Sequence, residues 1–437
     1  MNPYRLDTPL AEIDGYLRRL FPICRSLTGE GNRETLRILN EIVPIRQFEV
    51  PSGTPVYDWV IPDEWHIRDA WVAAPDGRRI VDFKASNLHV VSYSEPVRGR
   101  LSWPELQPYL HTHPQLADAL PYRTSYYRQD WGFCLTHGQY RELEQLDGPF
   151  EVVIDSTLQP GSLTYGELLL HGQSRQEILL SCYICHPSMA NDSLSGVLLT
   201  AFLARELMAL TSRYYSYRIV FVPETIGAIA YCARNEDAMK QIDCGLVITT
   251  VGGPGPFGYK QSFNAGHALN RLIEQVFAEA KVDYLTYPFD IHGSDERQYS
   301  SQGFGINIAT ICRDKYYEYP QYHSSLDNLE LVTAQQIGET LALYRQLIVK
   351  LEARRLYRNC MPHGEVMLSR HDLYPISGGA MLPEQGGRTE LDLILWLLFK
   401  CDGRRSLADI SMELEVTEAS LLPIVERLMS TGVLERV

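Results

Sequence analysis

The chain has 437 residues, which is too long for one ordinary domain and long enough for two or three. Its formal net charge of -14 argues against general nucleic-acid binding and against docking to acidic membranes. No apolar run approaches the roughly 20 residues of a membrane-spanning helix, and no secretory signal is visible. The nine cysteines lack the spacing of a disulfide framework, so we expect reduced thiols and a cytoplasmic location.

The N-terminal third of the chain changes character along its length. Apolar residues at helical spacing predict helices over 9–21 and 31–42. From 57 to 117, short aromatic and β-branched runs alternate with turns, which predicts a small β-rich insertion domain. An aromatic-dense stretch follows over 122–134, and such a stretch is more often core or interdomain packing than a binding site.

From residue 149 onward, strands and helices alternate. Strands are predicted over 151–155, 163–171, 177–185, 217–222, 245–251 and 304–311, and helices over 197–210, 226–235, 266–280 and 333–356. This alternation predicts an α/β fold of three layers, with helices on both faces of a mixed sheet. Residues 1–56 and 118–357 would together form this main domain, interrupted by the insertion.

The C-terminal part predicts a separate module. Residues 358–387 are rich in proline, glycine and polar residues, which is typical of a linker or extension. Three short helices and a final strand then predict a winged helix-turn-helix domain over 388–437. Between Thr389 and Val437 nine acidic residues oppose five basic ones, whereas a phosphate-binding face should be basic. We therefore expect no DNA binding, and instead docking of a peptide or protein, or self-association.

The stretch from 177 to 196 contains the first candidate site. Its apolar half predicts a buried strand, and the polar loop behind that strand holds His186 and Asp192. Open α/β sheets bind ligands in the loops after the carboxyl ends of their strands. Cys182-Tyr-Ile-Cys185-His186 also matches the attachment motif of c-type haem. Both cysteines lie in an apolar strand, and no second cysteine pair accompanies them. We therefore interpret Cys182 and Cys185 as small core residues.

Three further polar groups follow strands in the same way. Glu224 comes directly after 217–222, where burial would raise its pKa and suit it to act as a general base. It would equally suit the start of a helix, where a carboxylate interacts with the helix dipole. The turn 293–297 brings together two acids and an arginine, and His323 lies in a later loop. Each group alone favours a structural role, but all of them lie at strand ends on one edge of the sheet.

In this order, the motifs resemble those of the co-catalytic zinc aminopeptidases, a superfamily that includes bacterial leucyl aminopeptidases and glutaminyl cyclases. The matching motifs are His186, Asn191-Asp192-Ser-Leu-Ser-Gly196, Pro223-Glu224-Thr-Ile-Gly227, Ser294-Asp295 and Tyr322-His323-Ser-Ser-Leu-Asp327. The resemblance covers about residues 150–330, the N-terminal helices and the closing helix. The whole chain most resembles bacterial aminopeptidase-like proteins with a β-rich insertion and a C-terminal winged helix, often found in polysaccharide or natural-product gene clusters.

The resemblance implies a metal site and a base. His186, Asp192 and His323 would be the metal ligands, Glu224 the general base, and Asp295 the acid near the substrate amine or leaving group. Two imidazoles and one carboxylate with an open fourth position are typical of catalytic zinc. The resemblance therefore implies a zinc-dependent, aminopeptidase-like amide hydrolase. A deacylase or amidase acting on a sugar or natural-product precursor could use the same residues.

Three positions depart from the family pattern. Thr225, Thr250 and Ser188 occupy places where the family usually has carboxylates. We therefore expect one zinc ion rather than two, and a non-catalytic scaffold that binds peptides or proteins stays open as an alternative. The candidates for substrate contacts, each of which also fits a structural role, are Arg297, Arg313, Tyr259, His292 and Glu296.

Overall fold

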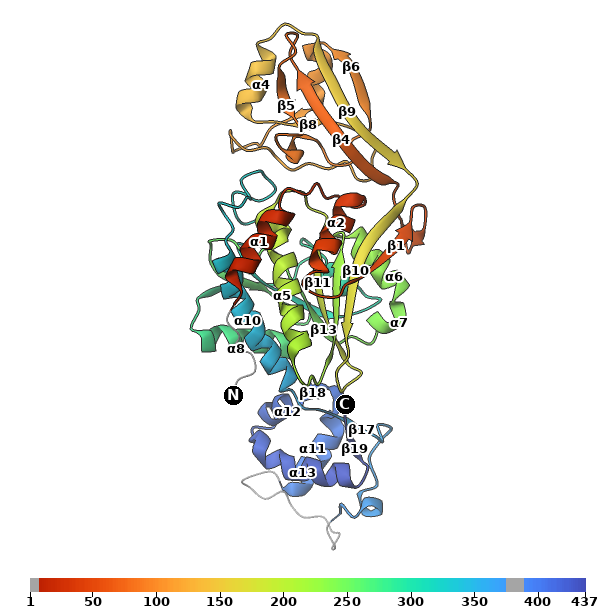
Figure 1. The fold of residues 1–437 in the computed structure, drawn as a ribbon. Helices are drawn as coiled ribbons and strands as arrows, with labels where there is room; N and C mark the ends of the chain where they lie inside the picture. The colour runs from red at the N-terminus through yellow and green to blue at the C-terminus, as the bar shows by residue number, and fades with distance from the viewer. Residues whose placement is uncertain (1–7, 375–388) are drawn as a thin grey trace. The chain divides into compact units, whose positions relative to one another are not determined.

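The computed structural model of the chain describes residues 8–374 and 389–437 (Figure 1). The chain divides into two compact units, Met1–Gln346 and Leu347–Val437. All nine cysteines are free thiols. Within the described ranges, no helix combines the length and the apolar character needed to cross a membrane.

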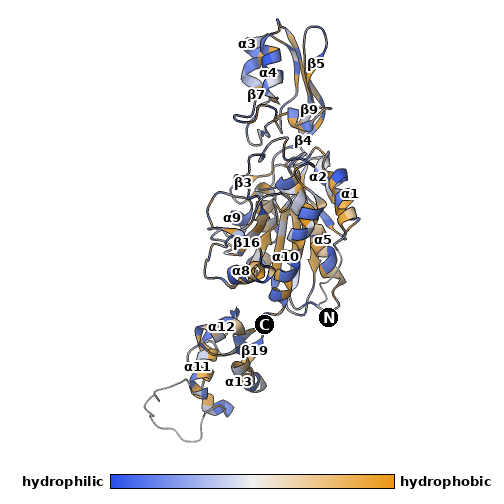
Figure 2. Ribbon diagram, turned by 90° about the vertical axis from the view of Figure 1, so that its left-hand side faces the viewer, coloured by the Kyte–Doolittle hydropathy of each residue, from blue (hydrophilic) through white to orange (hydrophobic). Residues whose placement is uncertain are grey.

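A mixed sheet of eight strands forms the centre of the first unit. Its order is β1 (Arg46–Pro51), β10 (Ser162–Leu170), β12 (Ser216–Val222), β11 (Glu177–Tyr183), β13 (Cys244–Val247), β16 (Asn307–Arg313), β14 (Phe257–Lys260) and β15 (Tyr284–Tyr287). The central strands β12, β11, β13 and β16 run parallel, whereas β10 and β14 pair antiparallel with their inner neighbours. Every residue of β12 is buried, because helices cover both faces of the sheet (Figures 1 and 2). This is the predicted three-layer architecture.

Helices of the first unit follow the apolar periodicity of the sequence. They are α1 (Leu10–Leu20), α2 (Glu30–Leu39), α5 (Gly196–Ala209), α6 (Ile226–Arg234), α7 (Glu236–Met239), α8 (Ala268–Ala280), α9 (Glu296–Tyr299) and α10 (Ala334–Glu352). In α1 the buried residues Ile13, Leu17 and Leu20 form one stripe, as a surface helix requires. In contrast, α5 buries residues all around its axis, because it packs between the sheet and other helices.

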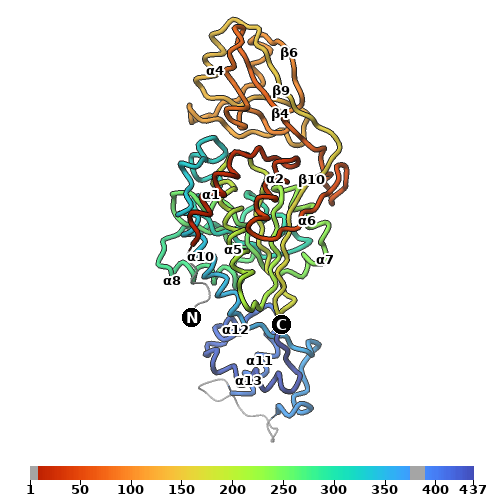
Figure 3. The backbone as a smooth tube through the Cα atoms, in the orientation of Figure 1, coloured from red at the N-terminus to blue at the C-terminus, as the bar shows by residue number. Residues whose placement is uncertain are grey.

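The insertion is a sheet of four strands in the order β5 (Arg79–Asp82), β4 (Glu64–Ala73), β9 (Phe150–Gln159) and β6 (Val97–Leu101). Smaller elements complete it: α3 (Trp103–Leu106), β7 (Leu110–His111), β8 (Phe133–Cys134) and α4 (His137–Glu144). The hairpin of β2 (Pro55–Val56) and β3 (Trp59–Val60) packs instead with α6 in the core of the large sheet. Phe133 and Phe150 are fully buried in its core. Figure 3 shows the backbone passing from β9 directly into β10 and so back to the large sheet.

One predicted strand belongs to a different sheet. The alternation of strands and helices predicts 151–155 in the main sheet, but this segment is part of β9 and pairs with β4 and β6. The insertion therefore continues well beyond the predicted boundary at 117. The burial pattern of a strand shows which residues face a core, but it does not show which core.

The second unit is a winged helix. It contains α11 (Glu390–Lys400), α12 (Leu407–Glu413), α13 (Glu418–Ser430) and a sheet in the order β18 (Asp402–Ser406), β17 (Leu356–Asn359), β19 (Leu434–Arg436). The segment 358–387 is not simply a linker, because it begins within β17, and Leu368 and Leu373 pack into the winged-helix core. The rest of that prediction, 375–388, lies outside the described residues.

Candidate metal and active site

The first two candidate ligands lie where β11 ends and α5 begins. His186 follows β11 by three residues, and Asp192 lies in a tight turn over Ala190–Ser195. Gly196 then starts α5 beside the end of β13. A Cβ atom on Gly196 would lie 2.2 Å from the carbonyl oxygen of Ile248, so glycine is required for this close approach.

Asp327 holds the turn from behind. Its carboxylate is fully buried and accepts hydrogen bonds from the N–H groups of Asn191 (2.6 Å) and Asp192 (2.9 Å). The hydroxyl of Tyr319 donates to the same carboxylate at 3.0 Å. The hydroxyl of Tyr183 donates to Oδ1 of Asp192, and this contact leaves Oδ2 for another partner.

Three side chains converge on that oxygen. Asp192 Oδ2 lies 3.9 Å from Nε2 of His186 and 3.1 Å from Nε2 of His323, and one ligand atom from each residue lies within 4.8 Å of the others. Among the described residues, neither Asp192 Oδ2 nor His323 Nε2 has a hydrogen-bond partner of suitable geometry. Buried polar atoms are rarely left unpaired. Two imidazoles and a carboxylate arranged in this way fit a divalent cation.

The protonation states also suit a cation. Burial lowers the pKa of His186 to about 4, so its imidazole is neutral at neutral pH. Burial alone would raise the pKa of Asp192, but the neighbouring His186 and His323 outweigh it and the pKa falls to about 2. Metal ions bind the neutral imidazole and the ionised carboxylate. His186 and Asp192 therefore need to release little or no proton when a cation binds.

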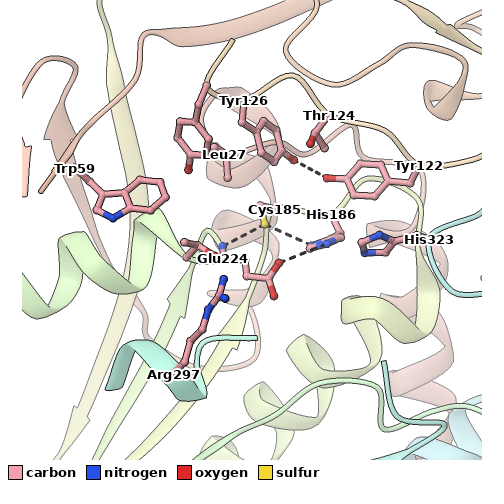
Figure 4. A pocket seen from close by; sticks show the side chains of 12 residues that line it. Leu27, Trp59, Tyr122, Thr124, Tyr126, Cys185, His186, Glu224, Arg297 and His323 are labelled. Carbon is pink, nitrogen blue, oxygen red and sulfur yellow. Dashed lines mark hydrogen bonds and ion pairs between the residues drawn. The ribbon is translucent and has the colours of Figure 1, made fainter. Parts of the chain in front are cut away.

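Glu224 lies beside the three ligands, directly after β12. Its Oε2 is 3.8 Å from Nε2 of His186, and its backbone N–H donates to Sγ of Cys185 at 3.2 Å (Figure 4). Burial raises the pKa of Glu224 well above its usual value, and the carboxylates of Asp295 and Asp192 raise it further. A raised pKa makes this carboxylate a stronger base than an ordinary glutamate, which suits a general base.

Asp295 forms a second buried carboxyl group near Glu224. Its Oδ1 accepts the backbone N–H of Thr225 at 2.7 Å, whereas Oδ2 has no hydrogen-bond partner among the described residues. Burial raises the pKa of Asp295 to about 7, although the Thr225 N–H opposes this and Glu296 adds to it. The two carboxyl groups therefore resist carrying two negative charges together.

The three departures from the family pattern all lie close to this site. Thr225 has a φ of 63° and uses its backbone to hold Asp295. The hydroxyl of Thr250 is buried and has no hydrogen-bond partner within the described part of the chain. Ser188 donates to the carbonyl of Phe21 at 3.0 Å. None of these side chains can replace a carboxylate as the ligand of a second zinc ion.

A cavity of about 330 Å³ opens in front of the ligands (Figure 4). Its lining comprises Leu27, Trp59, Tyr122, Thr124, Tyr126, Tyr127, Cys185, His186, Glu224, Thr225, Arg297 and His323. We call this cavity the metal pocket. The ring of Tyr122 lies 5.2 Å from both imidazoles, centre to centre.

The aromatic wall was missed by sequence reasoning. The stretch 122–134 was expected to serve packing, but Tyr122, Tyr126 and Tyr127 line the metal pocket. One signal could have identified them, because arginine, serine and threonine interrupt these tyrosines, unlike in a core segment. Cys182 is a core residue as predicted, whereas Cys185 is buried and also contacts the pocket.

Of the five candidates for substrate contacts, Arg297 alone is in the pocket lining. The side chain of His292 is exposed. Its backbone carbonyl accepts a hydrogen bond from the ammonium group of Lys260. Arg313 pairs with Glu339 on α10 at 2.5 Å, so its guanidinium stabilises helix packing.

The other two candidates are also engaged elsewhere. The carboxylate of Glu296 is buried and accepts hydrogen bonds from Thr310 (2.7 Å) and Tyr316 (2.9 Å). Tyr259 is fully buried and its hydroxyl donates to Glu274. Neither residue lines the metal pocket.

The chain is similar to known proteins over most of its length. A curated protein of Clostridium acetobutylicum, described as "Putative polysaccharide biosynthesis protein with aminopeptidase-like domain", is 43% identical over 402 residues, which is 92% of this chain and 90% of that protein. A crystal structure of a "putative peptidase" from the same organism is 39% identical, with a TM-score of 0.79, and covers 100% of this chain and 98% of its own.

More distant structures show the fold alone. The zinc aminopeptidase of Bacillus subtilis is 11% identical and covers 79% of this chain and 96% of its own, with a TM-score of 0.55. This likeness confirms the zinc-aminopeptidase fold that the motifs predicted. A winged helix-turn-helix model matches residues 355–436, and a model described as a domain of unknown function, DUF4910, matches 15–354. The chain therefore belongs to the DUF4910 family, with a zinc-aminopeptidase-like fold followed by a winged helix.

Proposed function

We propose that the chain is a zinc-dependent, aminopeptidase-like amide hydrolase with one metal ion. The observation that carries this proposal is the convergence of His186, Asp192 and His323 around unpaired, buried polar atoms beside Glu224. A zinc ion held by these residues would polarise a substrate carbonyl and lower the pKa of a water molecule.

Glu224 would transfer protons during the reaction, and Asp295 lies beside it. Glu224, with its raised pKa, takes the proton of the attacking water and passes it to the leaving amine. Asp295 is fully buried and outside the pocket lining, so it would act on Glu224, whose pKa its carboxylate raises. Arg297 lies at the same pocket, where it can pair with a substrate carboxylate.

One metal ion is favoured over two by the side chains at the second position. Thr225 and Thr250 stand where the family usually has carboxylates, and Ser188 binds the carbonyl of Phe21. In the part of the chain that the structure describes, one group of three or more His, Cys, Asp or Glu side chains has the geometry for a metal ion.

A deacylase or amidase acting on a sugar or natural-product precursor is the close variant of this proposal. It is supported by the relative described as a polysaccharide biosynthesis protein. The same ligands and base would cleave such an amide, so the substrate panel must contain both N-acylated sugars and aminoacyl amides. Preference for one class would decide between the two activities.

Metal analysis and a Glu224→Gln variant test the proposal. We expect one zinc per purified chain, and loss of zinc in His323→Ala. Glu224→Gln should keep the zinc but lower amide hydrolysis by about 100-fold or more. Glu144→Gln, at an exposed position of α4, is the matched control and should leave activity unchanged. If the protein contained no zinc, or if hydrolysis did not depend on Glu224, the proposed zinc hydrolase would be rejected. If the protein bound zinc but hydrolysed no amide, the non-catalytic scaffold would be favoured.

We also propose that the winged helix docks a peptide or protein, or a second copy of the chain. Leu395, Trp396 and Phe399 on α11 are exposed, with Phe399 at 77%. Large apolar side chains grouped on a surface are typical of interaction sites. Phe399→Ser should abolish partner capture or self-association and leave hydrolysis intact; unchanged association would reject docking through α11.

The free cysteines support a reducing location, which we propose is the cytoplasm. Eight of the nine are buried or partly buried, and Cys360 is exposed. A thiol titration of freshly purified, unfolded protein should therefore count nine thiols. A substoichiometric count would argue against this location.

A further inference from the structure

A second cavity lies beside the metal pocket. It has a volume of about 590 Å³ and is lined by Pro62 and Asp63 just before β4, the loop before β6, residues 125–129 and the end of β9. We call it the outer cavity. Tyr126 and Tyr127 line both cavities, so the two are neighbours along one wall. A cavity of this size is in the range of sites for small ligands, and the metal pocket alone is at the lower end of that range.

A row of aromatic rings runs from one cavity into the other. The ring of Trp59, in the metal pocket, lies 5.1 Å from that of Tyr127. Tyr126 lies 6.3 Å from Tyr127 and 5.4 Å from Tyr93, which lines the outer cavity. Tyr127 is 56% exposed although it belongs to this row. The row offers an extended ligand a continuous aromatic surface.

The outer cavity is rich in polar side chains that no protein group uses. Asp63, Glu95, Arg128, Gln129 and Gln159 line it, and none of them makes a side-chain hydrogen bond or ion pair with another described residue. Carboxylates accept hydrogen bonds, guanidinium groups donate them, and amides do both. An apolar ligand would bury these groups without partners, which costs free energy.

The end of β9, from Ser156 to Gln159, forms one wall of this cavity. The carbonyl of Ser94 accepts the hydroxyl of Ser156 (2.8 Å) and the indole N–H of Trp65 (2.9 Å), so the loop before β6 lies against β9 there.

We propose that the outer cavity binds a glycosyl group of an extended substrate whose amide lies in the metal pocket. Sugars carry hydroxyl groups around a ring that pair with amides and carboxylates, and C–H faces that pack on aromatic rings. Two carboxylates and one guanidinium favour a neutral or amino sugar over an acidic one. This inference rests on the proposed amide hydrolysis and specifies its substrate class.

Direct binding separates this inference from the catalytic proposal. The zinc-loaded full chain is titrated calorimetrically with neutral, N-acetylated and amino di- and trisaccharides, and with tripeptides of matched size. We expect at least one saccharide to bind. The double variant Gln129→Ala/Gln159→Ala should lower the affinity for this saccharide by about tenfold, because two hydrogen bonds are lost. Gln115→Ala, at an exposed position outside the cavity lining, is the control and should bind normally.

Each outcome decides the inference. Glu224→Gln should abolish hydrolysis and keep saccharide binding. Saccharide binding by this inactive variant would support the outer cavity as a glycosyl site independently of catalysis. Tyr127→Ala should weaken the same saccharide, because it removes the ring that links the two cavities. Absence of saccharide binding, binding that ignores the cavity variants, or cavity-dependent binding of tripeptides alone would each overturn the inference.

Discussion

The close approach of α5 to the end of β13 predicts a large effect of one methyl group. In Gly196→Ala, the new Cβ would lie 2.2 Å from the carbonyl oxygen of Ile248 and 2.8 Å from its carbonyl carbon. The segment before α5 and the segment after β13 cannot easily move apart, because the N–H of Val251 donates a hydrogen bond to the hydroxyl of Ser195 at 3.0 Å. Both segments must therefore shift against their own hydrogen bonds.

The expected cost follows from the overlap. A carbon atom and a carbonyl oxygen normally keep more than 3.0 Å apart, so the shift is nearly an ångström. Overpacking of this kind costs about 1–3 kcal/mol, and we expect the upper part of this range because backbone rather than a flexible side chain is displaced. The turn that holds Asp192 ends at Ser195, directly before Gly196, so zinc affinity should fall as well, by about tenfold.

Gly15→Ala is the matched control. Gly15 lies exposed in the middle of α1, and a Cβ there meets nothing within 4 Å. Alanine should therefore stabilise the helix by about 0.5–1 kcal/mol. Urea unfolding, monitored by tryptophan fluorescence, measures the change in the free energy of unfolding for both variants. Competition with a zinc chelator measures the zinc affinity. If Gly196→Ala were as stable and bound zinc as tightly as the wild type, the close approach and its role in the ligand turn would both be wrong.

Three other substitutions test separate parts of the structure. Asp327→Asn keeps the shape but loses one acceptor oxygen, so chelator competition should show zinc affinity reduced by about 10- to 100-fold; an unchanged affinity would contradict its role behind the turn. Burial lowers the pKa of His89, so the unfolded state takes up a proton that the folded state does not. Stability should fall as the pH drops below about 6.5, and urea titrations from pH 7.5 to 5 should show a shallower fall in His89→Asn; equal slopes would refute this. Arg345→Ala leaves the buried carboxylate of Glu206 unpaired and should lower the free energy of unfolding by about 3–5 kcal/mol, whereas a change below 1 kcal/mol would show that water reaches the pair.

The positions of the site residues could be predicted because they depend on local signals. A buried apolar strand reveals where it ends, and parallel strands bring their carboxyl ends to one edge of the sheet. His186 and Glu224 follow β11 and β12 within a few residues, so their neighbourhood in the structure follows from sequence alone. Thr225 stands out as a missing carboxylate only through the resemblance to the zinc aminopeptidases.

The remaining features depend on contacts between distant segments. Whether Tyr126 lines a pocket or fills a core is decided by where the insertion places it, and nothing local to 122–134 encodes that. β9 has the alternating burial of an ordinary strand, and its partner β4 lies about eighty residues earlier in the chain. Arg313 ends a strand of the sheet as expected, but Glu339 takes up its charge.

The charges around the site favour a single cation. Asp192 carries one negative charge, and the pair of Glu224 and Asp295 resists carrying two, because Asp295 is fully buried, Glu224 is partly buried, and the carboxylate of Asp295 raises the pKa of Glu224. One divalent cation would balance Asp192 and one charge of this pair. A second would add two positive charges to a buried site where Thr225 and Thr250 supply none to offset them, and uncompensated buried charge is costly. The replacement of those two carboxylates therefore changes the electrostatic balance as well as the number of ligands, and both changes favour a centre with one metal ion.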